Sequence, residues 1–415
     1  MQVLVIGAGP AGATAARALA RAGVTVRLLD RSKFPRNKPC GGGISLRVLP
    51  RFPYLDDALA RISTHRVSRL YLEGPDGDST VIHSRVPAAL MIRRVEFDAL
   101  LVSLAREAGA ELIEGVDIVA AVQNANGVTV TSRDGRTFTG ALAIAADGVH
   151  SVTARRLGLN DGWPDTAIAL DMMEESPRQV LRDVDPSTMW VAYGVNGGPG
   201  YGYVFPKRDH VNVGIGYVLN HYRQEIDAHP YEVQRTFVGE LRRRGFVEGE
   251  SERANFTPFL IPVGGPLRRP GRGRVILAGD AGGFVNGFTA EGIYYAMVSG
   301  EHAANSVVDS LREGIAGLAR RYQRAVDHEI GAELRDSVLI QRYLFADRRR
   351  ITAVVAGAER APAITRMILE FAVGELSYRT LRRRVFAEAP LLAGRLLWER
   401  LRTLVRPGAE AAGTA

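Results

Sequence analysis

Residues 3–30 read VLVIGAGPAGATAARALARAGVTVRLLD, and this stretch decides the fold. The run VLVIG, 3–7, is typical of a buried strand, and AARALARAG, 15–23, is an Ala-rich helix that ends at a glycine. VTVRLLD, 24–30, is a second apolar run of strand type. A strand, a tight turn, a helix and a second strand within about 30 residues make the smallest unit that joins two parallel strands. The sequence therefore predicts a parallel β-α-β unit here.

The rest of the chain predicts an α/β fold made of discontinuous domains. Helix and buried-strand patterns alternate over 95–151 and 274–311, whereas 165–220 is rich in strand patterns. Residues 127–140 alternate around an Asp-Gly turn, which predicts a β-hairpin. We expect a Rossmann-like cofactor-binding domain, an inserted strand-rich substrate domain and a helical C-terminal region. The expected boundaries are 1–66, 93–160 and 264–325 for the first, 67–92 and 161–263 for the second, and 326–408 for the helical region.

The glycines of the first turn have the spacing Gly7-x-Gly9-x-x-Gly12. Gly7 permits the tight turn, Gly9 lets the backbone approach a pyrophosphate, and Gly12 allows helix and strand to pack closely. The pyrophosphate then lies at a helix N-terminus, where free N–H groups favour an anion. Asp30 ends the second strand 18 residues after Gly12 and is placed to accept from ribose hydroxyls. The alternative is a chance Gly-rich turn.

Two further strand-to-loop turns contain aspartate. Ala145-Ala146-Asp147-Gly148 follows one buried strand, and Ala278-Gly279-Asp280-Ala281 follows another, before a Gly-rich loop and a helix. Taken alone, each sequence is also typical of an ordinary turn that is capped by aspartate and binds no cofactor. The three motifs in this order are far more specific than any one of them.

Together these motifs resemble the FAD-binding fingerprints of the flavoprotein family that includes aromatic hydroxylases, flavin halogenases and geranylgeranyl reductases. Arg94, in RxxFD at 94–98, also matches that family. The resemblance implies that Gly7, Gly9, Gly12 and Asp30 hold the ADP half of FAD, that Arg94 and Asp147 support the pyrophosphate region, and that Asp280 binds the ribityl chain. A helix expected to start near Ala290 would direct its positive end at the flavin. The other cofactor-binding candidates in these motifs are Ala11, Arg31, Gly148, Gly279, Gly287 and Thr289.

Two segments favour one branch of the family. KPCGGGIS, 38–45, resembles the KPCGG loop of geranylgeranyl reductases, and YGYVFP, 201–206, resembles their aromatic segment with Tyr203 in place of a tryptophan. Flavin halogenases need a lysine in the first half, and this chain has none between 38 and 207. The candidate catalytic residues are Cys40 and Tyr201, as proton donors or positioning groups. The candidate substrate-binding residues are Gly41, Gly42, Tyr203, Phe205 and Pro206.

Simpler interpretations of these segments stay open at this point. A lone cysteine is more often a small buried hydrophobe, and three aromatic rings on one strand face often belong to a core. Lys38 could bind a substrate phosphate, although a solvated charge is the favoured interpretation. The glycines of 41–43 would remove bulk so that backbone and substrate approach a flavin ring closely.

The resemblance implies an FAD-dependent reductase that saturates C=C bonds of a geranylgeranyl or other polyprenyl chain, carried by a lipid, a diphosphate or a quinone. The alternative is an FAD monooxygenase that hydroxylates an aromatic or polyketide-like compound, and a third is a non-catalytic flavoprotein. No second dinucleotide motif is present, so NADPH or another external donor must visit a transient site. No metal site is expected.

The composition limits the possible cellular compartments and binding partners of the protein. The chain has 415 residues, one cysteine and a net charge of +8. One cysteine fits a reducing compartment, and the sequence has no signal peptide and no run long enough to span a bilayer, so we expect a cytoplasmic protein. The segment APLLAGRLLWERLRTLVR, 389–406, could pack on the protein or contact a membrane surface through Trp398. No nucleic-acid motif accompanies the basic charge, and the oligomeric state is left open.

Overall fold

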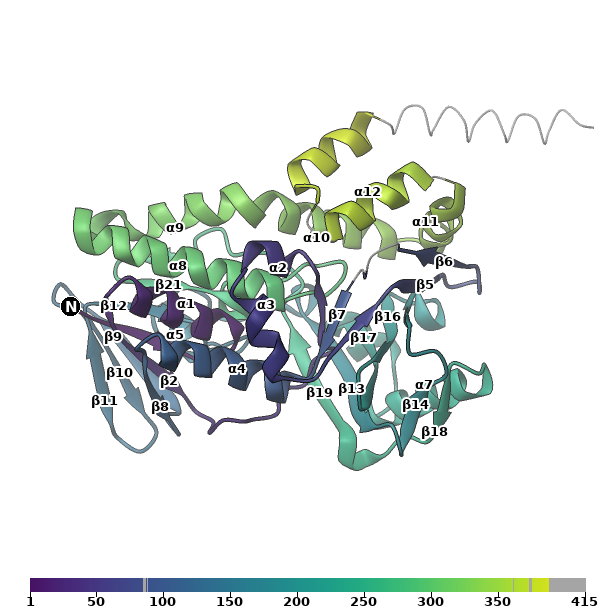
Figure 1. The fold of residues 1–415 in the computed structure, drawn as a ribbon, viewed down its shortest axis with the longest axis horizontal. Helices are drawn as coiled ribbons and strands as arrows, with labels where there is room; N and C mark the ends of the chain where they lie inside the picture. The colour runs from purple at the N-terminus through teal and green to yellow at the C-terminus, as the bar shows by residue number, and fades with distance from the viewer. Residues whose placement is uncertain (85–86, 88, 361, 373–374, 388–415) are drawn as a thin grey trace, which may run out of the picture.

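The computed structural model describes residues 1–84, 87, 89–360, 362–372 and 375–387. Figure 1 shows two main sheets next to each other, with helices packed on the first sheet and a helical layer over the top of the molecule. The expected α/β fold is confirmed. The expected segment 389–406 with Trp398 lies outside the described residues.

The first sheet has six strands, and all but the edge strand β20 run parallel to their neighbours. Its spatial order is β20 (Gly271–Arg272), β21 (Val275–Leu277), β12 (Leu142–Ala145), β1 (Gln2–Ile6), β2 (Thr25–Asp30) and β8 (Glu111–Glu114). The helices on it are α1 (Pro10–Arg21), α4 (Arg94–Glu107) and α8 (Ile293–Glu313). Because parallel strands need crossover connections, neighbouring strands of this sheet come from segments that are far apart in the sequence.

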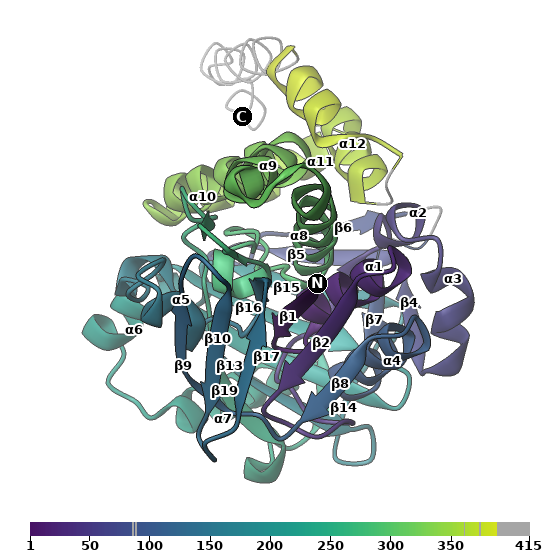
Figure 2. The ribbon, with the colours of Figure 1, turned by 90° about the vertical axis from the view of Figure 1, so that its left-hand side faces the viewer.

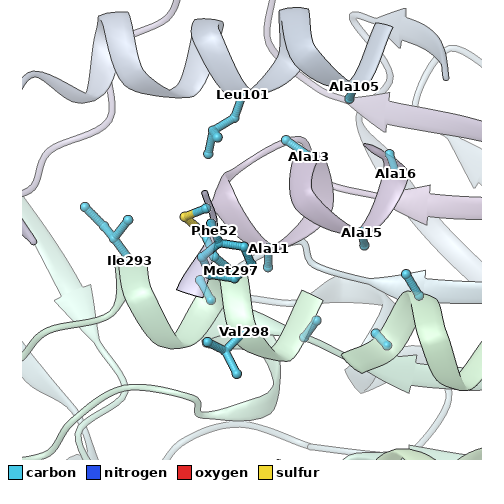
Figure 3. Packing of buried hydrophobic residues seen from close by; sticks show 14 of the residues in the cluster. Ala11, Ala13, Ala15, Ala16, Phe52, Leu101, Ala105, Ile293, Met297 and Val298 are labelled. Atoms are coloured by element: carbon cyan, nitrogen blue, oxygen red, sulfur yellow. The ribbon is translucent and has the colours of Figure 1, made fainter. Parts of the chain in front are cut away.

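Helix α1 is rich in alanine because it lies between two other helices. Figure 3 shows Ala13 and Ala16 on the side of α4, and Ala11 and Ala15 on the side of α8. The approach of α8 is so close that a Cβ at Gly300 would lie 2.2 Å from the Ala11 carbonyl oxygen. Small side chains therefore set the spacing of these helices and hold the N-terminus of α1 in place.

The second large sheet has seven strands and is antiparallel except for the pair β15 and β5. Its spatial order is β19 (Phe256–Ile261), β13 (Ala169–Pro177), β17 (His210–Val218), β16 (Gly200–Pro206), β15 (Thr188–Tyr193), β5 (Arg69–Glu73) and β6 (Ser79–His83). Helix α7 (Pro230–Arg243) covers its outer face through Phe237, Val238 and Leu241. The opposite face of the sheet is therefore the one that faces the rest of the molecule.

Three smaller sheets complete the β structure. The expected hairpin is confirmed in the sheet β11 (Thr137–Gly140), β10 (Val128–Ser132) and β9 (Ile118–Gln123). The second has the order β3 (Gly43–Ser45), β7 (Ala89–Ile92) and β4 (Thr64–Val67). The third pairs β14 (Leu181–Asp183) with β18 (Val247–Gly249). The short helices are α2 (Val48–Arg51), α3 (Leu55–Ala58), α5 (Val152–Arg156) and α6 (Leu219–Glu225).

The C-terminal part is helical, as expected. Figure 2 shows its helices as one layer above the sheets, in agreement with Figure 1. They are α9 (Leu318–Val326), α10 (Ala332–Phe345), α11 (Arg348–Arg360) and α12 (Pro362–Ala372). Buried ion pairs such as Arg47 to Glu333, 2.9 Å, join this layer to the first half of the chain. None of the described helices is both long enough and apolar enough to span a bilayer.

Candidate active site

A single cavity of about 880 Å³ collects residues from both large sheets. This volume lies in the range of cofactor and ligand clefts. Its lining includes every predicted site residue except Gly12 and Pro206. The carboxyl ends of β1 and β2 open into one end, and the inner face of the seven-stranded sheet forms the other. Residues 250 positions apart in the sequence, such as Asp30 and Asp280, therefore line the same cavity.

The first glycine turn has the geometry that a dinucleotide requires. Gly7 has φ +94°, and a Cβ there would lie 2.3 Å from the Ala146 carbonyl oxygen. A Cβ at Gly12 would lie 1.8 Å from the Gly7 carbonyl oxygen. Gly12 therefore allows the helix to pack closely on the turn, and it does not line the cavity. A Cβ at Gly9 would have no protein atom closer than Arg36 Nη2 at 3.8 Å. The open space at Gly9, at the N-terminus of α1, is a cradle that fits a pyrophosphate.

The Asp30 carboxylate is fixed by two backbone donors. Ala8 N donates to Asp30 Oδ2 at 2.7 Å, and Ser32 N donates to Oδ1 at 2.8 Å. Each carboxylate oxygen keeps a further lone pair. Asp30 can therefore also accept from ribose hydroxyls, and that role stays a prediction.

The Asp147 carboxylate caps the turn that follows β12. Ser151 Oγ donates to its Oδ1, and Thr153 N donates to its Oδ2 at 3.0 Å. Burial raises the pKa of Asp147 above its ordinary value, although these hydrogen bonds oppose the rise. Asp147 therefore organises the wall of the cavity at the start of α5, and its support of a pyrophosphate stays a prediction.

Arg94 lies at the start of α4 and is buried. It binds Asp98 through two hydrogen bonds of 2.6 and 2.8 Å, and its charge interacts electrostatically with the nearby Cys40 side chain. Burial favours loss of its proton, but Asp98 and Cys40 outweigh this and raise the pKa of Arg94. Arg94 thus places a permanent positive charge beside the Cys40 loop.

The loop before α8 is held by its own polar groups. Asn286 Oδ1 accepts from Phe288 N and from Thr289 N, both at 3.0 Å, and Gly287 N donates to Ser337 Oγ at 2.8 Å. Ala290 has φ +56°, an uncommon value for a residue with a side chain. Helix α8 begins at Ile293, so the expectation that it starts near Ala290 is three residues early.

Two of the three glycines that follow Cys40 lie at positions where a side chain would not fit. A Cβ at Gly41 would lie 2.9 Å from two carbons of the Phe205 ring, and one at Gly42, where φ is +73°, would lie 2.2 Å from the Ile92 carbonyl oxygen. Asn212 Nδ2 holds the loop by donating to the Cys40 carbonyl at 3.2 Å. Close packing on the protein itself therefore requires Gly41 and Gly42. Both also line the cavity, and their predicted contact with substrate and flavin stays a prediction.

The three rings of β16 line the cavity, and their predicted contact with substrate stays a prediction. The ring centroids of Tyr201 and Tyr203 are 5.6 Å apart, and those of Tyr203 and Phe205 are 4.5 Å apart. Pro206, at the end of β16, is not among the lining residues of the described chain, so the structure does not favour its predicted contact with substrate.

Sequence reasoning missed the continuation of this wall. Tyr193 on β15 stacks on Phe288 with centroids 4.6 Å apart, and Phe345 from α10 lies 6.3 Å from Tyr193. Leu70 and Leu72 of β5 line the same end of the cavity. A strand pattern shows that such residues are buried, but not which partner buries them, and so nothing in the sequence pointed to this set.

Two ionisable groups in the cavity were missed or misjudged. Asp171 of β13 lies in the lining and accepts from the Tyr203 hydroxyl at 3.0 Å. Lys38 is half-buried in the lining of the cavity, with its Nζ 4.7 Å from the centroid of Phe259, so it is not the fully solvated charge of the favoured interpretation. Burial lowers the pKa of Lys38. A lone acid within ALDMM, 169–173, was the only signal for Asp171.

Comparison with known proteins agrees with this geometry. The family described as FAD binding domain matches residues 1–324. Fold and site together define the class of the protein, an FAD-dependent oxidoreductase.

Named relatives narrow the class. Geranylgeranyl diphosphate reductase, chloroplastic, of Oryza sativa subsp. japonica is 32% identical over 335 residues, covering 76% of this chain and 68% of the relative. Digeranylgeranylglycerophospholipid reductase 2 of Methanothermobacter thermautotrophicus is 30% identical over 361 residues, covering 82% and 87%. The chain belongs to the geranylgeranyl reductase family of FAD-dependent oxidoreductases. The crystal structure of a geranylgeranyl bacteriochlorophyll reductase-like protein from Thermoplasma acidophilum shares the fold, with a TM-score of 0.77 at 20% identity and coverage of 95% and 98%.

Proposed function

We propose that this protein saturates C=C bonds in a geranylgeranyl or other polyprenyl chain of a lipid, a diphosphate or a quinone. The observation that carries the proposal is the single cavity, in which the dinucleotide cradle at Gly9 continues into an apolar wall formed by Tyr201, Tyr203 and Phe205. A wall of aromatic rings and aliphatic side chains suits a prenyl chain, which has no polar groups. The names of the two relatives support the same substrate class.

The residues of the chain would bind, orient and shield the substrate. Bound FAD in its reduced form supplies hydride to one carbon of the double bond. The rings of β16 hold the chain against the loop at 40–43, and the apolar side chains around the bound chain exclude water from the reacting carbons. Since an isolated alkene accepts hydride poorly, a side chain must give a proton to the other carbon.

The decisive experiment is mass spectrometry of products. Purified protein with bound FAD, reduced by dithionite without oxygen, is incubated with geranylgeranyl diphosphate, a digeranylgeranyl glycerophospholipid and a prenylquinone. A product that has gained two hydrogens per double bond supports the proposal. A product that has gained an oxygen atom, formed only in air, would instead establish the monooxygenase alternative.

The apolar end of the cavity should determine how long a chain fits. Leu72→Trp places a larger side chain in the lining formed by β5. We expect KM for a geranylgeranyl substrate to rise about tenfold or more, because roughly 1.4 kcal/mol of lost contact corresponds to a factor of ten, with little change for a geranyl substrate. Val81→Trp, on the exposed surface of β6, is the matched control. Equal effects on both chain lengths would contradict this path for the substrate.

NADPH is the electron donor that we propose. The support is indirect: reduction requires a two-electron donor, and the chain contains one dinucleotide fingerprint, which FAD occupies. Anaerobic mixing of the oxidised holoprotein with NADPH, NADH or a ferredoxin should bleach the flavin fastest with NADPH. Bleaching by ferredoxin alone would identify a different donor.

Peripheral contact with a membrane is proposed for the outer surface of α10. Leu339, Ile340 and Tyr343 are exposed there, and the exposed Arg342 and Arg349 provide positive charge. Such a surface favours anionic headgroups. Co-sedimentation with phosphatidylglycerol vesicles should exceed that with phosphatidylcholine vesicles and should fall in Leu339→Asp. Val122→Asp, on the distant strand β9, should bind as the wild type does, and an equal loss there would refute the assignment.

A further inference from the structure

Asp171 lies on the inner face of the seven-stranded sheet, on β13, the second strand from one edge. On β13 it stands opposite Gly216 of β17 and Phe259 of β19, neither of which carries an ionisable group. The Tyr203 hydroxyl donates to Asp171 Oδ2 at 3.0 Å, and Asp171 Oδ1 is buried without a hydrogen-bond partner among the described residues. A carboxyl oxygen without a partner is costly to bury unless it carries a proton or meets a ligand.

Tyr203 connects this carboxyl to the loop at 40–43. A Cβ on Gly41 would lie 3.3 Å from Tyr203 Cε2, so the Tyr203 ring packs directly on the loop. Asp171 and Tyr203 both line the cavity, as does Cys40. The Asp171 side chain is therefore in the part of the cavity where the aromatic wall meets the cysteine loop.

The charged and titratable groups around Asp171 are few. Lys38 lies over Phe259 across the strand pair, and Tyr201 and Tyr203 approach from β16. Burial raises the pKa of Asp171 to about 7, while the Tyr203 hydrogen bond and the Lys38 charge oppose the rise. At neutral pH a large fraction of the carboxyl is therefore protonated, whereas a carboxyl with its ordinary pKa would be ionised.

We propose that Asp171 is the proton donor of the reaction and that Tyr203 is its positioning residue, an inference that rests on the reductase function proposed above. The π bond of the alkene breaks, and its electron pair forms a new C–H bond with the Asp171 proton. The other carbon forms its C–H bond with the hydride from the reduced flavin, which is oxidised by two electrons. Asp171 is left as a carboxylate that Tyr203 and Lys38 stabilise, and water returns its proton.

Tyr201 is a weaker candidate for this step. Its hydroxyl makes no hydrogen bond among the described residues, and burial raises its pKa well above the ordinary value. A phenol with so high a pKa gives up its proton far less readily than a carboxyl with a pKa near 7. Tyr201 then serves as part of the aromatic wall that holds the chain.

The test combines a titration with turnover. In oxidised holoprotein labelled with [γ-¹³C]aspartate, the Asp171 signal is assigned by its absence in Asp171→Asn. We expect a midpoint near pH 7, which moves to higher pH in Tyr203→Phe and in Lys38→Met, because both changes remove interactions that favour the carboxylate. Tyr201→Phe is the matched control and should leave the midpoint in place. A midpoint in the ordinary aspartate range, near about 4, would overturn the proposal whatever the substrate is.

Turnover distinguishes this inference from the proposed function. The acid must be protonated to act, so alkene reduction should fall as pH rises through about 7, and this limb should move upward in Tyr203→Phe. Asp171→Asn should bind FAD as the wild type does but reduce alkenes about 100-fold more slowly or worse. If the wild type saturates prenyl chains and Asp171→Asn is equally fast, only the present inference fails. If the wild type saturates none, the proposed function fails and the role of Asp171 in it fails as well.

Discussion

Gly41 lies so close to Phe205 that a Cβ built on it would be 2.9 Å from two carbons of the ring. The contact joins the cysteine loop to the aromatic wall. Gly43, in the same loop, would bring its Cβ no closer than 3.4 Å to Phe205, which is an ordinary contact. The two glycines therefore provide a matched pair for testing how this contact affects activity.

Gly41→Ala should displace either the loop or the Phe205 ring, while Gly43→Ala should be accommodated. We expect kcat for alkene reduction to fall about tenfold or more in Gly41→Ala, because small misplacements of reacting groups are costly. FAD content and Tm should stay near wild type in Gly43→Ala. Equal kcat in the two variants would show that the contact does not position the site.

Substitutions at Gly9 and Gly12 should have different effects: one should weaken FAD binding and the other should lower the free energy of unfolding. Gly12→Ala creates a backbone clash with Gly7 and should lower the free energy of unfolding by about 3 kcal/mol or more, at the upper end of the cost of overpacking. Gly9→Ala projects its methyl group into the cavity, so it should weaken FAD binding while the apoprotein unfolds as the wild type does. Calorimetry of both apoproteins and FAD titration are the measurements. If the Gly9→Ala apoprotein were less stable than the wild type, the prediction that this substitution affects only FAD binding would be wrong.

Cys40→Ser should retain FAD and slow alkene reduction. The thiol lies in the electrostatic environment of Arg94 and accepts from Gly42 N at 3.4 Å, so the smaller serine oxygen alters the turn that faces the cavity. We expect a decrease of about tenfold or more, as for the loss of a positioned group. Since Cys40 is the only cysteine, thiol labelling reports on it directly, and FAD should protect it. Unchanged turnover would remove the thiol from the mechanism.

Glu329 should make stability depend on pH at the junction of the C-terminal helices. Burial raises its pKa, but hydrogen bonds from His302 and Arg51 outweigh burial and lower it to about 2. Because the folded pKa lies below the unfolded value, the stabilisation is present above about pH 4.3 and is lost as pH falls toward 2. Glu329→Gln should cost about 1–2 kcal/mol at neutral pH, after allowance for partial exposure, and less near pH 3.

Urea unfolding of both proteins across this pH range checks the prediction. Glu111→Gln, which removes an exposed ion pair with Arg27, is the control and should change stability little at any pH. A difference between Glu329→Gln and wild type that is constant with pH would show that the Glu329 charge does not contribute.

Local patterns predicted the geometry of the glycine turn and the position of Asp30. The turn at Gly7 to Gly12 and the acid at Asp30 are close in sequence, and their geometry follows from one β-α-β unit. The sequence also predicted that Tyr201, Tyr203 and Phe205 lie on one face of a strand, because alternate residues of a strand share a face. The sequence did not show whether that face borders a core or a cavity.

The sequence by itself determined the parallel unit, the glycine turn at the start of α1 and the family to which the chain belongs, because these depend on short-range spacing that only a few turns satisfy. Only the tertiary structure decided that Lys38 points into the cavity and that Asp171 meets Tyr203 there. Those groups come from a loop and two strands far apart in the chain. A single charged residue in a strand is not part of a repeating pattern, so its position cannot be predicted from the sequence. The environment that sets their ionisation exists only once both sheets enclose the same space.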